Sequence, residues 1–246
     1  MQLLLTKPAV LLNRPEFETV FSGDCPRKEH FECVGLPGTV LNLVQELQSV
    51  YAVRWPFYSE QTLYVDKRFA TPGTFTQQRL PIPDKRTLLA RMEQRLGTPY
   101  VWGGNWAPGI PEMLEYYPPA QTLSVQNQCL WTLSGLDCSG LLFEASNGTT
   151  PRNSSQLLHF GKAVSQAEAL NHWQRLDMIV YPGQVGRPGH VLFVRDQNTI
   201  IESKSPFGVR VCPIKDRLDE ILQERTWVDE WTDKTDPTRS FMIRRF

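Results

Sequence analysis

The spacing of apolar residues changes near residue 84 and divides the chain into two parts. Before it, short runs of β-branched and aromatic residues are separated by Gly, Pro and Ser, which is typical of strands. The clearest runs are 39–47, 49–56 and 62–69. Strands this short and closely spaced favour a small β-barrel of the SH3 kind, over residues 1–72. Residues 73–84 are rich in Pro and Thr, which indicates a linker.

After residue 84 the pattern becomes mixed. Asp84 is a candidate N-cap, and apolar residues at helical spacing predict a helix that ends at Gly97. A second helix begins at Cys138, and a third is expected at 216–224. Strand-like runs lie at 176–182, 190–196, 198–204, 208–214 and 240–246. Helices followed by an antiparallel meander predict an α+β domain over residues 85–246.

Composition and charge exclude several classes of function. The 246 residues contain 26 Lys plus Arg and 26 Asp plus Glu, so no net positive field favours nucleic acid as a partner. No apolar run reaches the length of about 18 residues that a membrane span needs. The first 16 residues lack the features of a signal peptide, so we expect a cytoplasmic protein, with action in the periplasm by another export route as the alternative. Nothing in the sequence indicates an oligomer, and we expect a monomer.

Cys138 is the candidate that carries chemistry, in the stretch GLDCSGLLFEA. It lies at a helix N-terminus, where backbone N–H groups and the helix dipole favour a thiolate. Asp137 is a plausible N-cap, and the small residues Ser139 and Gly140 leave the first turn uncrowded. A buried cysteine that only fills the core would show the same local pattern, because free cysteines are often buried. A nucleophile also needs a base.

His190 and Glu202 are the candidate partners of Cys138. His190 is expected at the first residue of a strand after a Pro-Gly turn, which is a common position for functional groups. Glu202 falls within the next strand of the same hairpin, and the alternation of residues allows its carboxylate to lie beside His190. A carboxylate in such a strand is uncommon without a partner. Cysteine, histidine and an orienting carboxylate together would form a triad.

Four blocks of the second part resemble the signature blocks of the NlpC/P60 family of cell-wall cysteine peptidases. They are GTPYVWGG (97–104), DCSGL (137–141), PRNSSQ (151–156) and GHVLFV (189–194). The blocks occur in the order typical of that family, and the 52 residues from Cys138 to His190 and the 12 from His190 to Glu202 also resemble its spacing. The first part is similar in position and length to the bacterial SH3 (SH3b) domains often joined to such enzymes.

The resemblance implies a papain-like catalytic domain preceded by an SH3b-like β-barrel. It implies hydrolysis of peptidoglycan stem peptides or muropeptides, at the bond between γ-D-glutamyl and a diamino acid such as meso-diaminopimelate, in cell-wall remodelling or recycling. By the same resemblance Cys138 is the nucleophile, His190 the base and Glu202 the third polar residue. Tyr100 matches a tyrosine that helps bind the oxyanion, and Ser139 and Trp102 match residues of the substrate cleft.

The sequence departs from the family pattern at three places. Glu202 stands where the family often has His, and we expect its charge to raise the pKa of His190. Asn153 stands where the SH3-linked subgroup commonly has an Asp that binds a free N-terminal amine, so a charge-assisted bond is lost there. Residues 105–136 form a long insertion rich in Pro and aromatic residues. It is either an ordered loop that packs on itself or an element that gates the substrate.

Other constellations are weaker. Cys25, His30 and Cys33 supply three potential zinc ligands, but their spacing fits no common zinc finger, so we expect neither a metal nor another cofactor. Five cysteines are present, and we expect all of them to be reduced. Besides a peptidase, two alternatives remain: a wall-peptide-binding protein with an idle catalytic constellation, and an acyltransferase of papain-like architecture. The identity of the product separates them.

Overall fold

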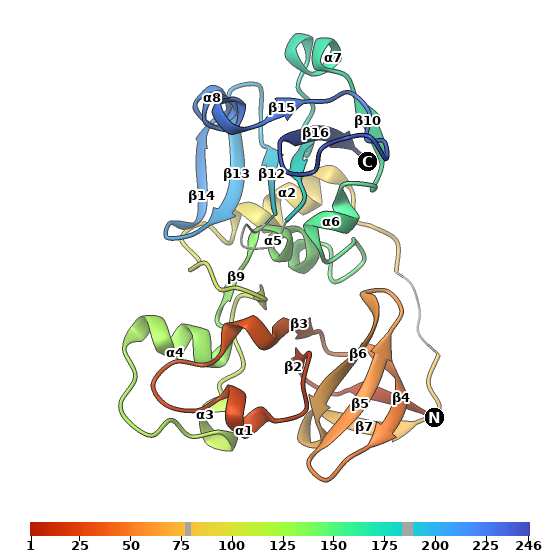
Figure 1. Cartoon of the computed structure of the whole chain (residues 1–246), viewed down its shortest axis with the longest axis vertical. Coiled ribbons are helices and arrows are strands. Elements are labelled where there is room, and N and C mark those ends of the chain that lie inside the picture. Colours follow the sequence, from red (N-terminus) through yellow and green to blue (C-terminus); the bar gives the residue numbers. More distant parts are fainter. Residues whose placement is uncertain (77–79, 184–188) are drawn as a thin grey trace.

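The computed structural model describes residues 1–76, 80–183 and 189–246. Figure 1 shows two β-sheets, one built by the N-terminal part of the chain and one by the C-terminal part, with helices around and between them. Part of the predicted linker and the turn just before His190 lie outside the described residues. No helix of the described residues is long and apolar enough to cross a membrane.

The N-terminal sheet contains seven antiparallel strands, in the order β3-β2-β6-β5-β4-β1-β7. They are β1 (Gln2–Leu5), β2 (Ala9–Leu12), β3 (Phe31–Gly35), β4 (Val40–Glu46), β5 (Val50–Trp55), β6 (Ser59–Asp66) and β7 (Ala70–Gly73). The strands expected in this part are present, to within three residues. The expected barrel is not shown, because among the described residues no pairing joins the terminal strands β3 and β7.

The C-terminal sheet follows the order β10-β16-β11-β12-β13-β14, and β15 pairs with β16 in parallel. Its strands are β10 (Lys162–Val164), β11 (Met178–Tyr181), β12 (His190–Val194), β13 (Thr199–Lys204), β14 (Gly208–Pro213), β15 (Thr226–Trp227) and β16 (Ser240–Arg245). Successive strands from β11 to β14 are antiparallel, which is the predicted meander. The predicted mixture of helices and strands is therefore confirmed for this part of the chain.

Helices cover both faces of the C-terminal sheet. Its helical neighbours are α2 (Lys85–Glu93), α5 (Cys138–Ala145), α6 (Ser154–Leu157), α7 (Gln166–Asn171) and α8 (Ile214–Glu224). One buried cluster joins α2 and α5 to the sheet through residues such as Leu141, Val191 and Phe193. Another joins α8 to the opposite face through Leu192 and Ile200. Side chains alternate between faces along a strand, so each strand supplies both clusters.

The insertion at 105–136 is helical and packs on the N-terminal part. It contains β8 (Asn105–Trp106), α3 (Glu112–Tyr116), α4 (Val125–Thr132) and β9 (Gly135–Leu136), and it lies against α1 (Phe17–Val20). Short 3-10 turns occur at Lys28–His30 and Lys67–Phe69. Tyr117 stacks on Phe17 and Phe21, with ring centroids 5.5 Å apart in both pairs. Its hydroxyl donates a hydrogen bond to the buried Asp66 carboxylate. The insertion therefore contributes to the N-terminal core.

Candidate active site

Cys138 is the first residue of α5 and is buried. Asp137 caps the helix, since its Oδ1 accepts a hydrogen bond from the backbone N–H of Gly140 at 2.7 Å. Gly140 allows a close approach, because a Cβ at this position would lie 2.1 Å from the carbonyl oxygen of Gly104. The helix start thus presents a thiol beside backbone N–H groups at the positive end of the helix dipole.

His190 and Glu202 lie together, as the sequence pattern indicates. The register pairs Phe193 with Ile201 and Val194 with Ile200, so His190 at the start of β12 lies diagonally across from Glu202 on β13. His190 Nε2 and Glu202 Oε2 are 2.8 Å apart. Cys138 also lies close enough to His190 to raise the pKa of the imidazole. Since Nε2 faces Glu202, Nδ1 is the ring nitrogen that remains for the thiol.

The pKa values of the histidine and the carboxyl group are displaced in opposite directions. Burial by itself lowers the pKa of His190, but the hydrogen bonds to Cys138 and Glu202 and their negative charges outweigh it and raise the pKa to about 9. Burial raises the pKa of Glu202, whereas His190, Arg217 and Arg210 outweigh that effect and lower the pKa to about 2. The arrangement therefore favours an imidazolium held by a carboxylate at neutral pH.

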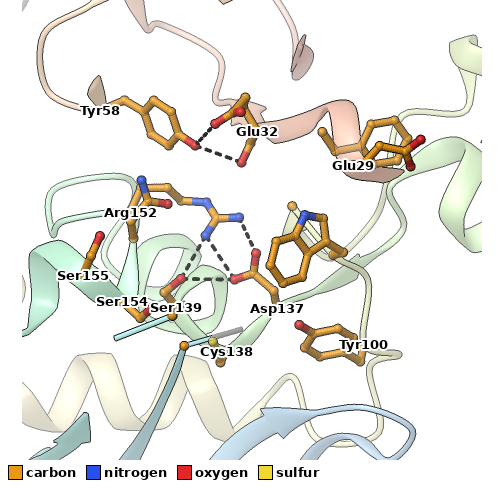
Figure 2. A pocket seen from close by; sticks show the side chains of 16 residues that line it. Glu29, Glu32, Tyr58, Tyr100, Asp137, Cys138, Ser139, Arg152, Ser154 and Ser155 are labelled. Carbon is orange, nitrogen blue, oxygen red and sulfur yellow. Dashed lines mark hydrogen bonds and ion pairs between the residues drawn. The ribbon is translucent and has the colours of Figure 1, made fainter. Parts of the chain in front are cut away.

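Cys138 opens into a cavity of about 590 Å³. Figure 2 shows its lining side chains. They come from β3 and the 3-10 turn before it, from α5 and α6, and from the loops that connect these elements. The residues that line it are Glu29, Phe31, Glu32, Tyr58, Tyr100, Trp102, Gly103, Asp137, Cys138, Ser139, Arg152, Asn153, Ser154, Ser155, Gly183 and Gly189. No described residue between 104 and 136 belongs to this lining, so the insertion stabilises the N-terminal part and does not itself wall the cavity.

The other sequence-predicted residues all line this cavity. Tyr100 is half-buried, and burial and the nearby negative charges of Asp137 and Cys138 raise its pKa, so its hydroxyl stays protonated and available as a donor. Trp102 is 42% exposed. Ser139 is buried and its Oγ lies 3.2 Å from Asp137 Oδ1. Asn153 precedes α6, and its backbone N–H donates to Gln156 Oε1 at 3.2 Å.

Arg152 was not predicted from the sequence as a site residue, although it is part of the PRNSSQ block. Its buried guanidinium donates to both carboxylate oxygens of Asp137, at 3.0 and 2.6 Å, and to Ser139 Oγ at 3.0 Å (Figure 2). Its Nε donates to Asn105 Oδ1, and the Asn105 side chain also bonds the N–H and carbonyl of Val34 on β3. Arg152 therefore connects the cap of the nucleophile helix to the N-terminal sheet.

The N-terminal part supplies one wall of the cavity, which sequence reasoning did not predict. Tyr58 donates a hydrogen bond to Glu32 Oε2 at 2.7 Å, above the Arg152–Asp137 pair in Figure 2. Glu29 lies in the 3-10 turn just before β3 and adds a second carboxylate to this wall. A wall that carries two carboxylates favours a positively charged group of the substrate.

No family model matches the sequence, and no curated protein matches it. Solved structures do match. The structural neighbours are NlpC/P60 family proteins. The chain is 21% identical to an NlpC/P60 family protein from Bacillus cereus, with a TM-score of 0.40, and the match covers 99% of this chain and 62% of that one. This chain therefore spans less than two thirds of that protein.

Two further neighbours differ in the share of the chain that they cover. RipD from Mycobacterium tuberculosis is described as a non-catalytic NlpC/p60 domain protein adapted to peptidoglycan binding. It is 21% identical, with a TM-score of 0.39, over 69% of this chain and 98% of its own. NlpC2 from Trichomonas vaginalis is 13% identical, with a TM-score of 0.36, over 87% of this chain and 68% of its own. At identities and scores this low, function has to be inferred from the residues of the cavity.

Among the described residues, no group of three or more His, Cys, Asp or Glu side chains is placed to hold a metal ion. His30, one of the three residues weighed as zinc ligands, has its Nδ1 3.0 Å from Asn13 Oδ1. Cys33 is buried in the core, whereas Cys25 is exposed. All five cysteines are free thiols.

Proposed function

We propose that the chain is a cysteine peptidase of the NlpC/P60 type that hydrolyses peptidoglycan stem peptides or muropeptides. The observation that carries the proposal is the contact chain from Cys138 to His190 to Glu202, located where a helix N-terminus meets a cavity. A buried cysteine that only filled the core would need neither a histidine held by a buried carboxylate nor an opening to solvent.

The reaction follows the chemistry of these groups. The Cys138 thiolate attacks the carbonyl carbon of the scissile amide, and the carbonyl electron pair moves onto oxygen. When that pair returns, the C–N bond breaks and the His190 imidazolium gives its proton to the leaving amine. A water molecule then attacks the thioester carbon as His190 takes its proton. The C–S bond breaks as the intermediate collapses, which releases the acid and restores the Cys138 thiolate and the His190 imidazolium. Glu202 stays ionised throughout and stabilises the imidazolium.

The oxyanion formed in both steps would be bound at the start of α5. First-turn N–H groups of a helix have no intrahelical acceptor, and a negative charge there is favoured by the helix dipole. Tyr100 lines the same cavity and keeps its proton, so its hydroxyl can donate to the same oxygen. Neither donor has to move during the reaction, because both belong to segments fixed by core packing.

The shape and charge of the cavity support a short, amine-bearing peptide as substrate. Glu29 and Glu32 place negative charge on the N-terminal wall, whereas Arg152 is already saturated by Asp137, Ser139 and Asn105. Stem peptides and muropeptides carry both free amines and γ-linked D-glutamate. The bond we propose is that between γ-D-glutamyl and a diamino acid such as meso-diaminopimelate, consistent with the resemblance of the four sequence blocks.

The nucleophile is tested by Cys138→Ala with a defined tripeptide and tetrapeptide as substrates and mass spectrometry of the products. We expect turnover to fall by at least about 100-fold, because the variant has no nucleophile. Cys25→Ala is the matched control, since that thiol is exposed and does not line the cavity, and it should keep wild-type turnover. Unchanged turnover in Cys138→Ala would contradict the proposal. Stem-peptide binding without any product would favour a binding protein, and a product bearing a new acceptor would favour an acyltransferase.

A further inference from the structure

Glu202 is fully buried and is contacted by two arginines in addition to His190. Arg210 on β14 donates two hydrogen bonds to Oε1, from Nε at 3.0 Å and from Nη2 at 2.7 Å. Arg217 on α8 donates from Nη2 to Oε2 at 3.2 Å, and its Nε lies 3.1 Å from Oε1. A carboxylate that served only to neutralise His190 would not need two further cations.

The two arginines reach Glu202 because of where its side chain points. Glu202 shares the sheet face of Ile200, which packs with Leu218 and Ile221 of α8. Arg217 follows the same face of α8 and is buried. Arg210 is the cross-strand partner of Glu202 in the β13–β14 register. Arg210 and Arg217 together form a clamp on the Glu202 carboxylate. This clamp is built from two separate elements, α8 and β14.

The two carboxylate oxygens of Glu202 have different hydrogen-bond partners. Oε2 accepts from His190 and Arg217, whereas Oε1 receives its short hydrogen bonds from Arg210. Arg217 Nε makes no hydrogen bond within the described part of the chain, so its approach to Oε1 is an ion pair without hydrogen-bond geometry. Arg210 is consequently the residue that fixes the rotation of the carboxylate about its terminal bond.

Other charged and titratable groups lie around Glu202, Arg217 and His190. Glu220 on α8 pairs with Arg217 and with Lys204, so the charge of Arg217 is partly neutralised. The Cys212 thiol on β14 lies 3.9 Å from Glu202 Oε1. Tyr181 on β11 packs beside His190, with ring centroids 5.9 Å apart, and Arg225 lies 4.1 Å from the centre of its ring. Cys138 on α5 completes the set.

We propose that Arg210 and Arg217 are positioning residues of the active site, which hold the Glu202 carboxylate in the one orientation that directs His190 Nδ1 at Cys138. This inference rests on the proposed function for its kinetic consequence. Its structural content, a histidine oriented through a clamped carboxylate, is independent of the substrate. A carboxylate free to rotate would let the imidazole turn, and a misplacement of about 1 Å costs on the order of 100-fold in rate.

The experiment compares Arg210→Gln with Arg210→Lys, which keeps the charge and one donor. Lys215→Gln is the control, because Lys215 lies on α8 but is exposed and pairs only with Asp219 among the described residues. Four quantities are measured: kcat and KM on the peptide, the rate of Cys138 alkylation by iodoacetamide against pH, and the pKa of His190 by NMR. The alkylation rate and the pKa of His190 can both be measured without a substrate.

We expect Arg210→Gln to lower kcat about 10-fold at unchanged KM. We also expect the pKa of His190 to fall by about one unit as Glu202 turns away, and the pH dependence of alkylation to change with it. Arg210→Lys should restore part of both effects, and Lys215→Gln should match the wild type. Loss of the cation alone would raise the pKa of His190, because a positive charge opposes the imidazolium, so a rise overturns the positioning role. An unchanged pKa and kcat overturn it as well.

The outcomes separate this inference from the proposed function. If the wild-type chain hydrolyses no stem peptide but the pKa of His190 still falls in Arg210→Gln, the function is wrong and the clamp stands. If Cys138-dependent hydrolysis is found but neither the pKa nor kcat responds, the function stands and the clamp is wrong. Arg217→Lys is a second variant for the buried side of the clamp, with circular dichroism to establish that it folds.

Discussion

At the residue scale, burial alone would lower the pKa of His190 and raise that of Glu202, and both pKa values are displaced the other way. Desolvation favours the neutral forms of both His190 and Glu202, yet their contact and the surrounding charges keep both ionised. The electrostatic stabilisation of the two ionised side chains requires short contacts, and the 2.8 Å separation of His190 Nε2 and Glu202 Oε2 provides one. The charged state of the pair is thus a consequence of geometry and would be lost if either side chain moved away.

Glu202→Gln tests this charge directly. The amide keeps the shape of the side chain but removes the charge that stabilises the imidazolium, so the pKa of His190 should fall from about 9 toward its ordinary value. Activity that depends on the imidazolium is lost as pH rises through the pKa of His190. The alkaline limb of the kcat profile should therefore move to lower pH, and kcat at neutral pH should fall on the order of 100-fold. A profile identical to that of the wild type would contradict the role of Glu202.

The site residues differ in how far the sequence could predict them. Cys138, His190 and Glu202 were predicted because a helix start and a strand alternation place them by local rules. Arg210 and Arg217 were missed, since a charged residue on a strand or a helix is usually solvated, and nothing in the local pattern shows that both reach one carboxylate. Arg152 was missed for the same reason, although its place in a block beside Asn153 was a usable signal.

At the scale of elements, α5 depends on its close approach to Gly104, the residue just before β8. Gly140→Ala should destabilise the fold by about 1–3 kcal/mol, because the added Cβ would lie 2.1 Å from a backbone carbonyl that cannot move as a side chain would. Urea denaturation measures the loss. A free energy of unfolding equal to that of the wild type would contradict the close approach.

The elements that the sequence did not predict are those whose partners are distant in the chain. The expected strands and helices of the C-terminal part are present because period-2 and helical patterns are local. The 105–136 insertion has no such periodicity, and its aromatic residues find their place only against Phe17, Phe21 and Asp66 of the N-terminal part. The barrel was expected because the short strands follow from local pattern, and these strands are present. Closure of a barrel depends instead on pairing between strands that are distant in the sequence, which the local pattern does not contain.

At the scale of the whole molecule, the cavity is completed only where the two parts of the chain meet. The N-terminal wall with Glu29, Glu32 and Tyr58 faces the nucleophile across the cavity, and the Asn105 side chain holds β3 to the region of α5. An isolated C-terminal part would lack these carboxylates. Under the proposed function, we therefore expect the N-terminal part to determine which peptides enter and the C-terminal part to carry the reacting groups.

Glu32→Gln tests this division of labour. If the carboxylate attracts a substrate amine, the variant should raise KM about 10-fold for stem peptides with a free N-terminal amine, the order expected for loss of a charge-assisted bond. N-acetylated peptides, which lack the positive charge, should show no such increase, and kcat should change little for either. Asn153→Ala is the comparison at another residue of the cavity lining. We expect it to change KM less, because the Asn153 side chain is a neutral amide. Equal effects of Glu32→Gln on free and acetylated peptides would mean that the N-terminal wall acts through shape rather than charge.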